Sequence, residues 1–176
     1  IYQSTRNNGL TAPSSAAVLR GIAPDGGLYI FKDFSAMDFD WRSALEKDTL
    51  GMAEQILSAL LPEFPDMGAL VRRAYLNKFE TEDLTPVVPV GGRYVLELFR
   101  GPTSAFKDVA LSMLPQLITS ARGIEDIDDE IVILTATSGD TGKAALEGFH
   151  DVPGTKIIVF FPENGVSAVQ KAQMVT

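Results

Sequence analysis

The feature that most constrains the fold is a pair of apolar runs separated by one predicted helix. The runs are Ile131–Leu134 and Lys156–Phe161, and each is typical of a strand buried on both faces. The segment between them is expected to be helical from Thr141 to about His150. A strand, a helix and a second strand in this order predict a parallel βαβ unit. We therefore predict an α/β fold built around these two strands.

The first part of the chain has a different character. A short helix is expected after Ser14 and should stop at Gly21, and a turn through Asp25-Gly26-Gly27 should lead into a strand over Leu28–Phe31. From Asp40 to Asn77 the apolar residues have helical spacing, with breaks at Pro62 and Pro65. This part is predicted to be mostly helical.

A change in character near residue 85 suggests a domain boundary. Pro86–Val90 and Tyr94–Phe99 flank the pair Gly91-Gly92 and are expected to form a two-stranded element. We predict a helical domain over residues 1–85 and part of an α/β domain over residues 86–176. We expect the sheet to be incomplete in this chain, and therefore expect a fragment of a longer protein.

The α/β part should contain two further helices. One is predicted from Phe106 to Ala121 and the other from Ser167 to the end of the chain. The expected buried face of the first helix consists of apolar residues, namely Val109, Ala110, Met113, Leu114 and Leu117.

Composition excludes several classes of function. The chain has no cysteine and one histidine, His150, which rules out thiolate chemistry and argues against a Ser-His-Asp triad or a zinc site. We expect no metal. A net charge of −8 argues against binding nucleic acid or an anionic membrane, and no segment reaches the roughly 20 apolar residues of a membrane helix. No secretory signal is visible, so a cytoplasmic location is expected.

The loop Thr135–Lys143 joins a predicted strand to a predicted helix, at the sheet edge where α/β proteins bind ligands. Its hydroxyl side chains and the free N–H groups of the helix could receive a carboxylate or phosphate. A tight turn with Ser138 or Asp140 as a helix cap explains the segment equally well. A nucleotide-binding P-loop is excluded, because it needs glycine where Thr137 stands and Ser or Thr where Ala144 stands.

Lys107 is the second candidate for chemistry. It is expected in the first turn of a helix, between Phe106 and Asp108. The helix dipole and contact with Phe106 would favour a neutral, nucleophilic amine that can form a Schiff base. A solvated surface lysine explains the same residue without any chemistry. Lys143 could attract a substrate phosphate, but a solvated helix residue is the simpler interpretation.

These segments together resemble the threonine synthase family. The matching segments run in order along the chain: Tyr2–Arg6, Gly21–Tyr29, Leu96–Phe99 with Gly101–Thr103 and Ala105–Asp108, Ala136–Gly142, and Phe161–Glu163 with Gly165–Ser167 and Gln173–Met174. The resemblance implies a pyridoxal-phosphate enzyme of fold type II, the tryptophan-synthase-like type, preceded by a family-specific N-terminal domain.

The resemblance also implies roles for individual residues. Lys107 would carry the cofactor as a Schiff base and shuttle protons, with Phe106 beside the ring and Asp140 near the ring oxygen. The substrate-binding residues would be those of the loop: Thr137, Ser138, Gly139, Asp140 and Thr141. The implied reaction converts O-phospho-L-homoserine and water to L-threonine and phosphate.

Two departures accompany the resemblance. Position 100 is arginine where histidine is expected, and the glycine-rich loop for the cofactor phosphate is expected beyond residue 176. The fragment alone should therefore bind the cofactor weakly and be inactive. Two alternatives remain open: another lyase of the same fold, such as a threonine or serine dehydratase, and a non-catalytic binding protein.

Overall fold

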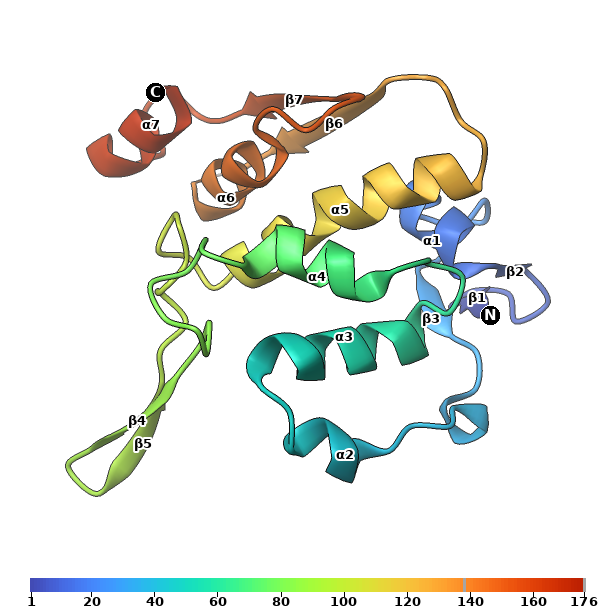
Figure 1. Ribbon diagram of the computed structural model, residues 1–176. Coiled ribbons are helices and arrows are strands. Elements are labelled where there is room, and N and C mark those ends of the chain that lie inside the picture. The colour runs from blue at the N-terminus through green and yellow to red at the C-terminus, as the bar shows by residue number, and fades with distance from the viewer. Residues whose placement is uncertain (138, 176) are drawn as a thin grey trace. The chain divides into compact units, whose positions relative to one another are not determined.

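The computed structural model describes residues 1–137 and 139–175 (Figure 1). The chain divides into two compact units, unit 1 with residues 1–72 and 117–128, and unit 2 with residues 73–116 and from 129 onward. Helices α4 (Met67–Tyr75) and α5 (Asp108–Ile124) contribute residues to both units. The division of the whole protein into domains at residue 85 stays a prediction.

Unit 1 begins with a three-stranded antiparallel sheet. Strands β1 (Tyr2–Ser4), β2 (Thr11–Ala12) and β3 (Tyr29–Phe31) are arranged in the order β2-β1-β3. Helix α1 (Ser14–Arg20) follows β2 and ends at Gly21, whose φ of 65° and N–H bond to the Ala17 carbonyl terminate the helix. The predicted helix and its glycine stop are confirmed, and so is the predicted strand over Leu28–Phe31, which begins one residue later, at Tyr29.

The start of α1 is held by a distant carboxylate. Pro13 stands at the cap position and supplies no side-chain hydrogen bond. Instead, the Glu63 carboxylate accepts hydrogen bonds from the Ser14 N–H, the Ser14 hydroxyl and the Ser15 N–H. A residue far along the chain therefore satisfies the free N–H groups of this helix.

The turn before β3 is held by a hydrogen bond from Ser4. The buried Ser4 hydroxyl donates to the Asp25 carboxylate at 2.8 Å, and the Gly27 N–H donates to the same carboxylate at 2.9 Å. A Cβ atom on Gly27 would lie 2.1 Å from the Ser4 hydroxyl oxygen, so only glycine fits this position. The N-terminal segments that matched the family pattern thus have a structural role in closing this turn.

The hydrogen bonds from Ser4 and Gly27 to the Asp25 carboxylate make the stability of the folded protein depend on pH. Hydrogen bonds from Gly27 and Ser4 lower the pKa of Asp25 below its ordinary value of 3.8. A lowered pKa contributes stability above the unfolded pKa, and that stability is lost as the pH falls through the folded pKa. We therefore expect Asp25→Asn to lower the thermal midpoint of the full-length protein most above about pH 4, with the difference closing at lower pH. Midpoints of both proteins measured across pH would contradict this if their difference were constant.

Three helices fill the predicted helical stretch of unit 1. They are α2 (Trp41–Leu45), α3 (Thr49–Leu60) and the beginning of α4, and the predicted breaks at Pro62 and Pro65 are confirmed. An additional break separates α2 from α3, because the Asp48 carboxylate accepts from the Gly51 N–H at 2.7 Å and starts a new helix. The turn between α3 and α4 and the first part of α4 supply buried apolar side chains, namely Leu61, Phe64, Met67, Leu70 and Val71.

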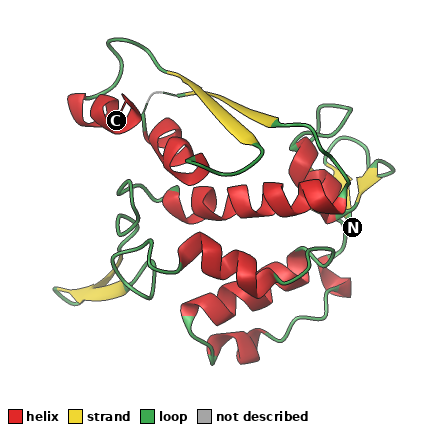
Figure 2. Ribbon diagram, turned by 45° about the horizontal axis from the view of Figure 1, so that its top comes forward, coloured by secondary structure: helices red, strands yellow, loops and turns green. Residues whose placement is uncertain are grey.

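Unit 2 contains the predicted βαβ arrangement. Strand β6 (Ile131–Ala136) pairs in parallel with β7 (Thr155–Phe160), and α6 (Asp140–Phe149) connects them. Figure 2 shows α6 on one side of these two strands. Helix α7 (Ala168–Val175) follows β7. The fold is the α/β class that the sequence predicts.

The burial of the two parallel strands differs from the prediction. Both strands alternate between partly buried and exposed residues instead of being buried on both faces. Helix α6 covers one face, while the other face leaves Val132, Leu134, Ile158 and Phe160 exposed among the described residues. Apolar runs indicate what a strand is suited to pack against, and among the described residues α6 packs on one face of these strands.

The remaining elements of unit 2 are an antiparallel hairpin and the first part of α5. The hairpin strands are β4 (Val87–Val90) and β5 (Arg93–Leu96), and Gly91 and Gly92 turn between them with φ of 54° and 76°. In Figure 1 the hairpin extends away from the other elements of this unit. Helix α5 begins at Asp108, two residues later than predicted, and its Ala110 is exposed rather than buried.

Helices α5 and α6 approach each other closely within unit 2. A Cβ atom placed on Gly148 would lie 2.1 Å from the backbone carbonyl oxygen of Leu111. Glycine at this position lets the backbone of α6 contact the backbone of α5.

Among the described residues, no helix combines the length and apolar character that crossing a membrane would require.

Candidate functional site

The segment before α5 is folded around one carboxylate. Asp108 is 2% exposed and accepts hydrogen bonds from the Thr103 N–H at 2.9 Å, the Thr103 hydroxyl at 2.5 Å and the Ala105 N–H at 3.3 Å. A Cβ atom on Gly101 would lie 2.5 Å from the Asp108 side chain, so a larger residue would displace this carboxylate. These contacts fix the backbone that carries Lys107.

Lys107 lies in the turn that precedes α5, rather than in the first turn of the helix as predicted. The reason is that the Asp108 carboxylate reaches back to Thr103 and Ala105 and holds this stretch in a turn. The Lys107 amine lies 4.8 Å from the centre of the Phe106 ring, and the side chain is half-buried. Within the described part of the chain, this amine forms no ion pair.

The loop between β6 and α6 is closed by Thr137. The Thr137 hydroxyl oxygen accepts from the Gly139 N–H at 3.1 Å and from the Gly142 N–H at 3.2 Å. This hydroxyl, predicted to bind substrate, therefore has a local structural role here. Gly139 has φ of 151°, a conformation that favours glycine, and Thr141 is exposed. The predicted contact of Ser138 lies outside the described residues.

Asp140 is the first residue of α6 and receives two polar contacts. The Gln170 amide donates to its carboxylate at 3.0 Å, and the Lys143 ammonium lies 3.3 Å from the same oxygen. The Gln170 hydrogen bond, followed by that of Lys143, lowers the pKa of Asp140, and the charges of Lys143 and Lys107 lower it further. The grouping of Lys107 and Asp140 in one site stays a prediction. The contact that joins their two segments is the hydrogen bond from the Lys143 ammonium to the Thr103 carbonyl.

Lys143 corrects the sequence interpretation. It was predicted to be a solvated helix residue, but its side chain is buried, with 8% of the residue exposed. Its ammonium donates to the Thr103 carbonyl at 2.9 Å and pairs with Asp140. The spacing of Asp140 and Lys143, three apart on one helix face, was a signal for the ion pair, but nothing in the sequence indicated the contact with Thr103.

Arg100 forms a separate contact near the Lys107 segment. Its guanidinium pairs with Glu80 at 2.8 Å and with Glu97 at 2.7 Å, and it lies 5.1 Å from the Phe99 ring centre. These hydrogen bonds raise the pKa of Arg100. Arg100, which departs from the family pattern, therefore connects the segments that carry Glu80 and Glu97.

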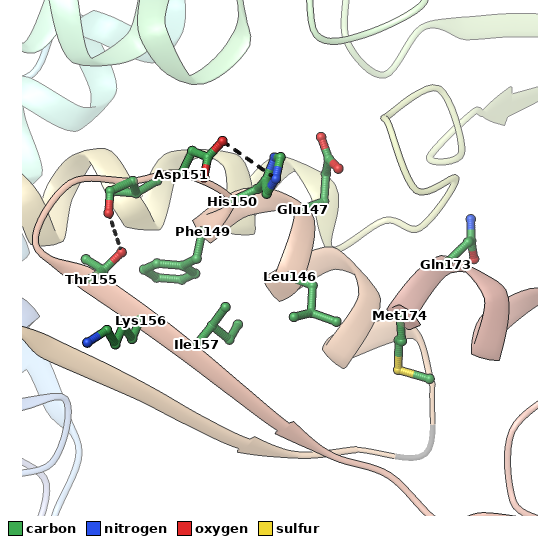
Figure 3. A pocket seen from close by; sticks show the side chains of 11 residues that line it. Leu146, Glu147, Phe149, His150, Asp151, Thr155, Lys156, Ile157, Gln173 and Met174 are labelled. Carbon is green, nitrogen blue, oxygen red and sulfur yellow. Dashed lines mark hydrogen bonds and ion pairs between the residues drawn. The ribbon is translucent and has the colours of Figure 1, made fainter. Parts of the chain in front are cut away.

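A cavity of about 450 Å³ lies at the opposite end of α6 from Asp140 (Figure 3). Apolar side chains of α6, β7 and α7, including Phe149, Ile157 and Met174, line it together with polar residues such as His150 and Lys156. Among the described residues, none of those predicted for catalysis, cofactor binding or substrate binding lines it.

Comparison with known proteins identifies the family. A family model described as "Threonine synthase N terminus" matches residues 1–89. The chain belongs to the threonine synthase family. The threonine synthase of Schizosaccharomyces pombe is 37% identical to it over 187 residues, and the match covers 99% of this chain. Threonine synthase-like 1 of Pongo abelii is 37% identical over 173 residues, covering 92% of the chain.

Solved structures of threonine synthases share the fold. A pyridoxal-phosphate-bound threonine synthase from Brucella melitensis matches 98% of this chain with a TM-score of 0.87 and 34% identity. The predicted fold-type II architecture is therefore confirmed at the level of the fold. The chain spans 36% of the length of the Schizosaccharomyces pombe protein, 23% of the Pongo abelii protein and 38% of the Brucella melitensis chain.

Proposed function

We propose that this chain is the N-terminal part of a threonine synthase, which converts O-phospho-L-homoserine and water to L-threonine and phosphate. The observation that carries the proposal is the half-buried Lys107 amine beside the Phe106 ring, which forms no ion pair among the described residues. Similarity to threonine synthases over nearly the whole chain supports the same reaction. The activity is proposed for the full-length protein.

The residues present fit pyridoxal phosphate. The cofactor is an aldehyde that enzymes attach to a lysine amine, and Lys107 provides that amine beside an aromatic ring. Asp140 provides a carboxylate at the start of α6, next to the loop that carries Gly139. When bound, the cofactor would supply an electron sink for carbanions on the substrate. The residues that hold its phosphate are expected outside residues 1–176.

Lys107 would move protons on the substrate. A lysine acts as a base only in its neutral form. Lys107 is half-buried, and its amine lies beside the Phe106 ring. A single amine on a flexible stem can serve several positions in turn. Lys107 therefore accounts for both the attachment and the proton transfers that the reaction needs.

Asp140 would remain ionised throughout the working pH range. Hydrogen bonds from Gln170 and Lys143 lower its pKa, so that it acts as an acceptor and a source of negative charge rather than as an acid. The loop through Gly139 would receive the substrate carboxylate at the start of α6. The contribution of Thr137, Ser138 and Thr141 to substrate binding is part of this proposal.

The proposal is tested by assaying the full-length protein with two substrates. We expect phosphate and threonine from O-phospho-L-homoserine, and no 2-oxobutyrate from threonine. Formation of 2-oxobutyrate from threonine without phosphate release from O-phospho-L-homoserine would instead identify a dehydratase of the same fold. Absence of both products would support a binding protein that lacks catalysis.

A further inference from the structure

We propose that Lys143 is a positioning residue that holds Asp140 and the Lys107 segment in a fixed relation to each other. This inference rests on the proposed function, because it assigns a role to a residue beside the proposed cofactor site. The polar partners of the Lys143 ammonium are the Thr103 carbonyl and the Asp140 carboxylate, and Lys143 is not proposed to contact the reacting atoms.

Lys143 is a buried cation that has two polar partners. Burying a lysine ammonium is costly unless the charge is paired and its N–H groups are hydrogen-bonded. Lys143 is 8% exposed, and its two polar partners, the Thr103 carbonyl and the Asp140 carboxylate, meet this requirement. Because removing either partner would leave a buried charge poorly compensated, the ammonium favours the arrangement that keeps both in place.

Lys143 also connects the start of α6 to the segment before Lys107. Thr103 is separated from Lys143 by 40 residues, and its own N–H and hydroxyl are bound to the buried Asp108 carboxylate. Lys143 thus reaches a part of the backbone that is already fixed, four residues before Lys107. The resulting chain of contacts runs from Asp140 through Lys143 and Thr103 to Asp108, the neighbour of Lys107.

The charge of Lys143 also influences the Asp140 carboxylate. Lys107 and Lys143 both act on the Asp140 carboxylate, and Gln170 bonds to the same oxygen as Lys143. Without Lys143, the carboxylate would keep Lys107 as its remaining cation among the groups that shift it. The relative position of the Lys107 amine and the carboxylate would then change, and with it the environment of a cofactor attached to that amine.

The test compares Lys143→Met with wild type in the full-length protein freed of cofactor. Methionine is close to lysine in length and carries no charge. We expect the dissociation constant of the Lys143→Met variant for added pyridoxal phosphate to rise by about tenfold or more, because a charge-assisted hydrogen bond and an ion pair are lost. We also expect the absorption maximum of the bound cofactor to move. Lys171→Met, which removes an exposed lysine of α7, is the matched control and should behave as wild type.

A double-mutant cycle shows whether Lys143 acts through Asp140. In an Asp140→Asn background, Lys143→Met should have a much smaller effect on cofactor affinity than in wild type, because an uncharged amide already replaces the partner carboxylate. Should the methionine variant not fold, Lys143→Gln keeps a donor for Thr103 and gives the same comparison.

The outcomes are distinct. A lower thermal midpoint in Lys143→Met with wild-type affinity and spectrum would make Lys143 a purely structural residue and overturn the inference. Additive effects in the double-mutant cycle would overturn it as well. If wild type itself fails to form a band that borohydride fixes onto Lys107, the proposed function falls and the positioning role falls with it.

Discussion

Replacing Lys107 with alanine in the full-length protein is expected to abolish the absorption band that pyridoxal phosphate should form with wild type. In wild type, borohydride should reduce the bond between cofactor and lysine and leave the label on the peptide that contains Lys107. The alanine variant lacks the amine, so no covalent label can form at this position. Absorption spectra before and after borohydride, followed by mass spectrometry of peptides, measure both effects.

The same variant should lose threonine formation by a factor of roughly 10² to 10⁴, the usual contribution of a positioned proton-transfer group, or more if attachment also matters. Lys156→Ala is a suitable control, since Lys156 is an exposed lysine paired with Glu130 at 2.7 Å on the sheet. It should keep the band, the label and the activity. If Lys107→Ala is labelled and active like wild type, the catalytic proposal is wrong.

The arrangement of strands and helices was largely predictable from the sequence. Apolar runs on both sides of a helical segment indicated the parallel pairing of β6 and β7, and Gly21 and Pro62 marked the ends of α1 and α3. These signals are local, because the periodicity of a strand or helix depends on neighbouring residues. Which layers cover a strand is not local, and the exposure of Leu134 and Phe160 on one face was accordingly not predicted.

The contacts that shape the site were less predictable, since they join residues far apart in the chain. The grouping of Lys107 with Asp140 in one site comes from their resemblance to a family pattern, and it stays a prediction. The contact of Lys143 with Thr103 and that of Gln170 with Asp140 had no local signal. The same holds for Glu63 at the start of α1, where a proline cap gave no hint of a distant acceptor.

The substitution Gly148→Ala is expected to destabilise the full-length protein by about 3 kcal/mol, because it would place a methyl group against the backbone of another helix. The added Cβ would lie 2.1 Å from the Leu111 carbonyl oxygen, and neither backbone can move without separating α5 from α6. The helix propensity of alanine would offset at most about 1 kcal/mol of this cost. Equilibrium unfolding in urea, compared with wild type, measures the difference.

Gly123→Ala is the matched control for this prediction. Gly123 also lies in a helix, but a Cβ atom at this position would meet nothing within 4 Å, so the change should be neutral or stabilising by up to about 1 kcal/mol. Equal effects of the two substitutions would show that α5 and α6 are not in backbone contact at Leu111. Because α5 begins next to Lys107 and α6 begins at Asp140, separating these helices should also weaken pyridoxal phosphate binding in Gly148→Ala. The same binding measurement on Gly123→Ala should match wild type, which ties the loss to the spacing of the two helices that bear the site.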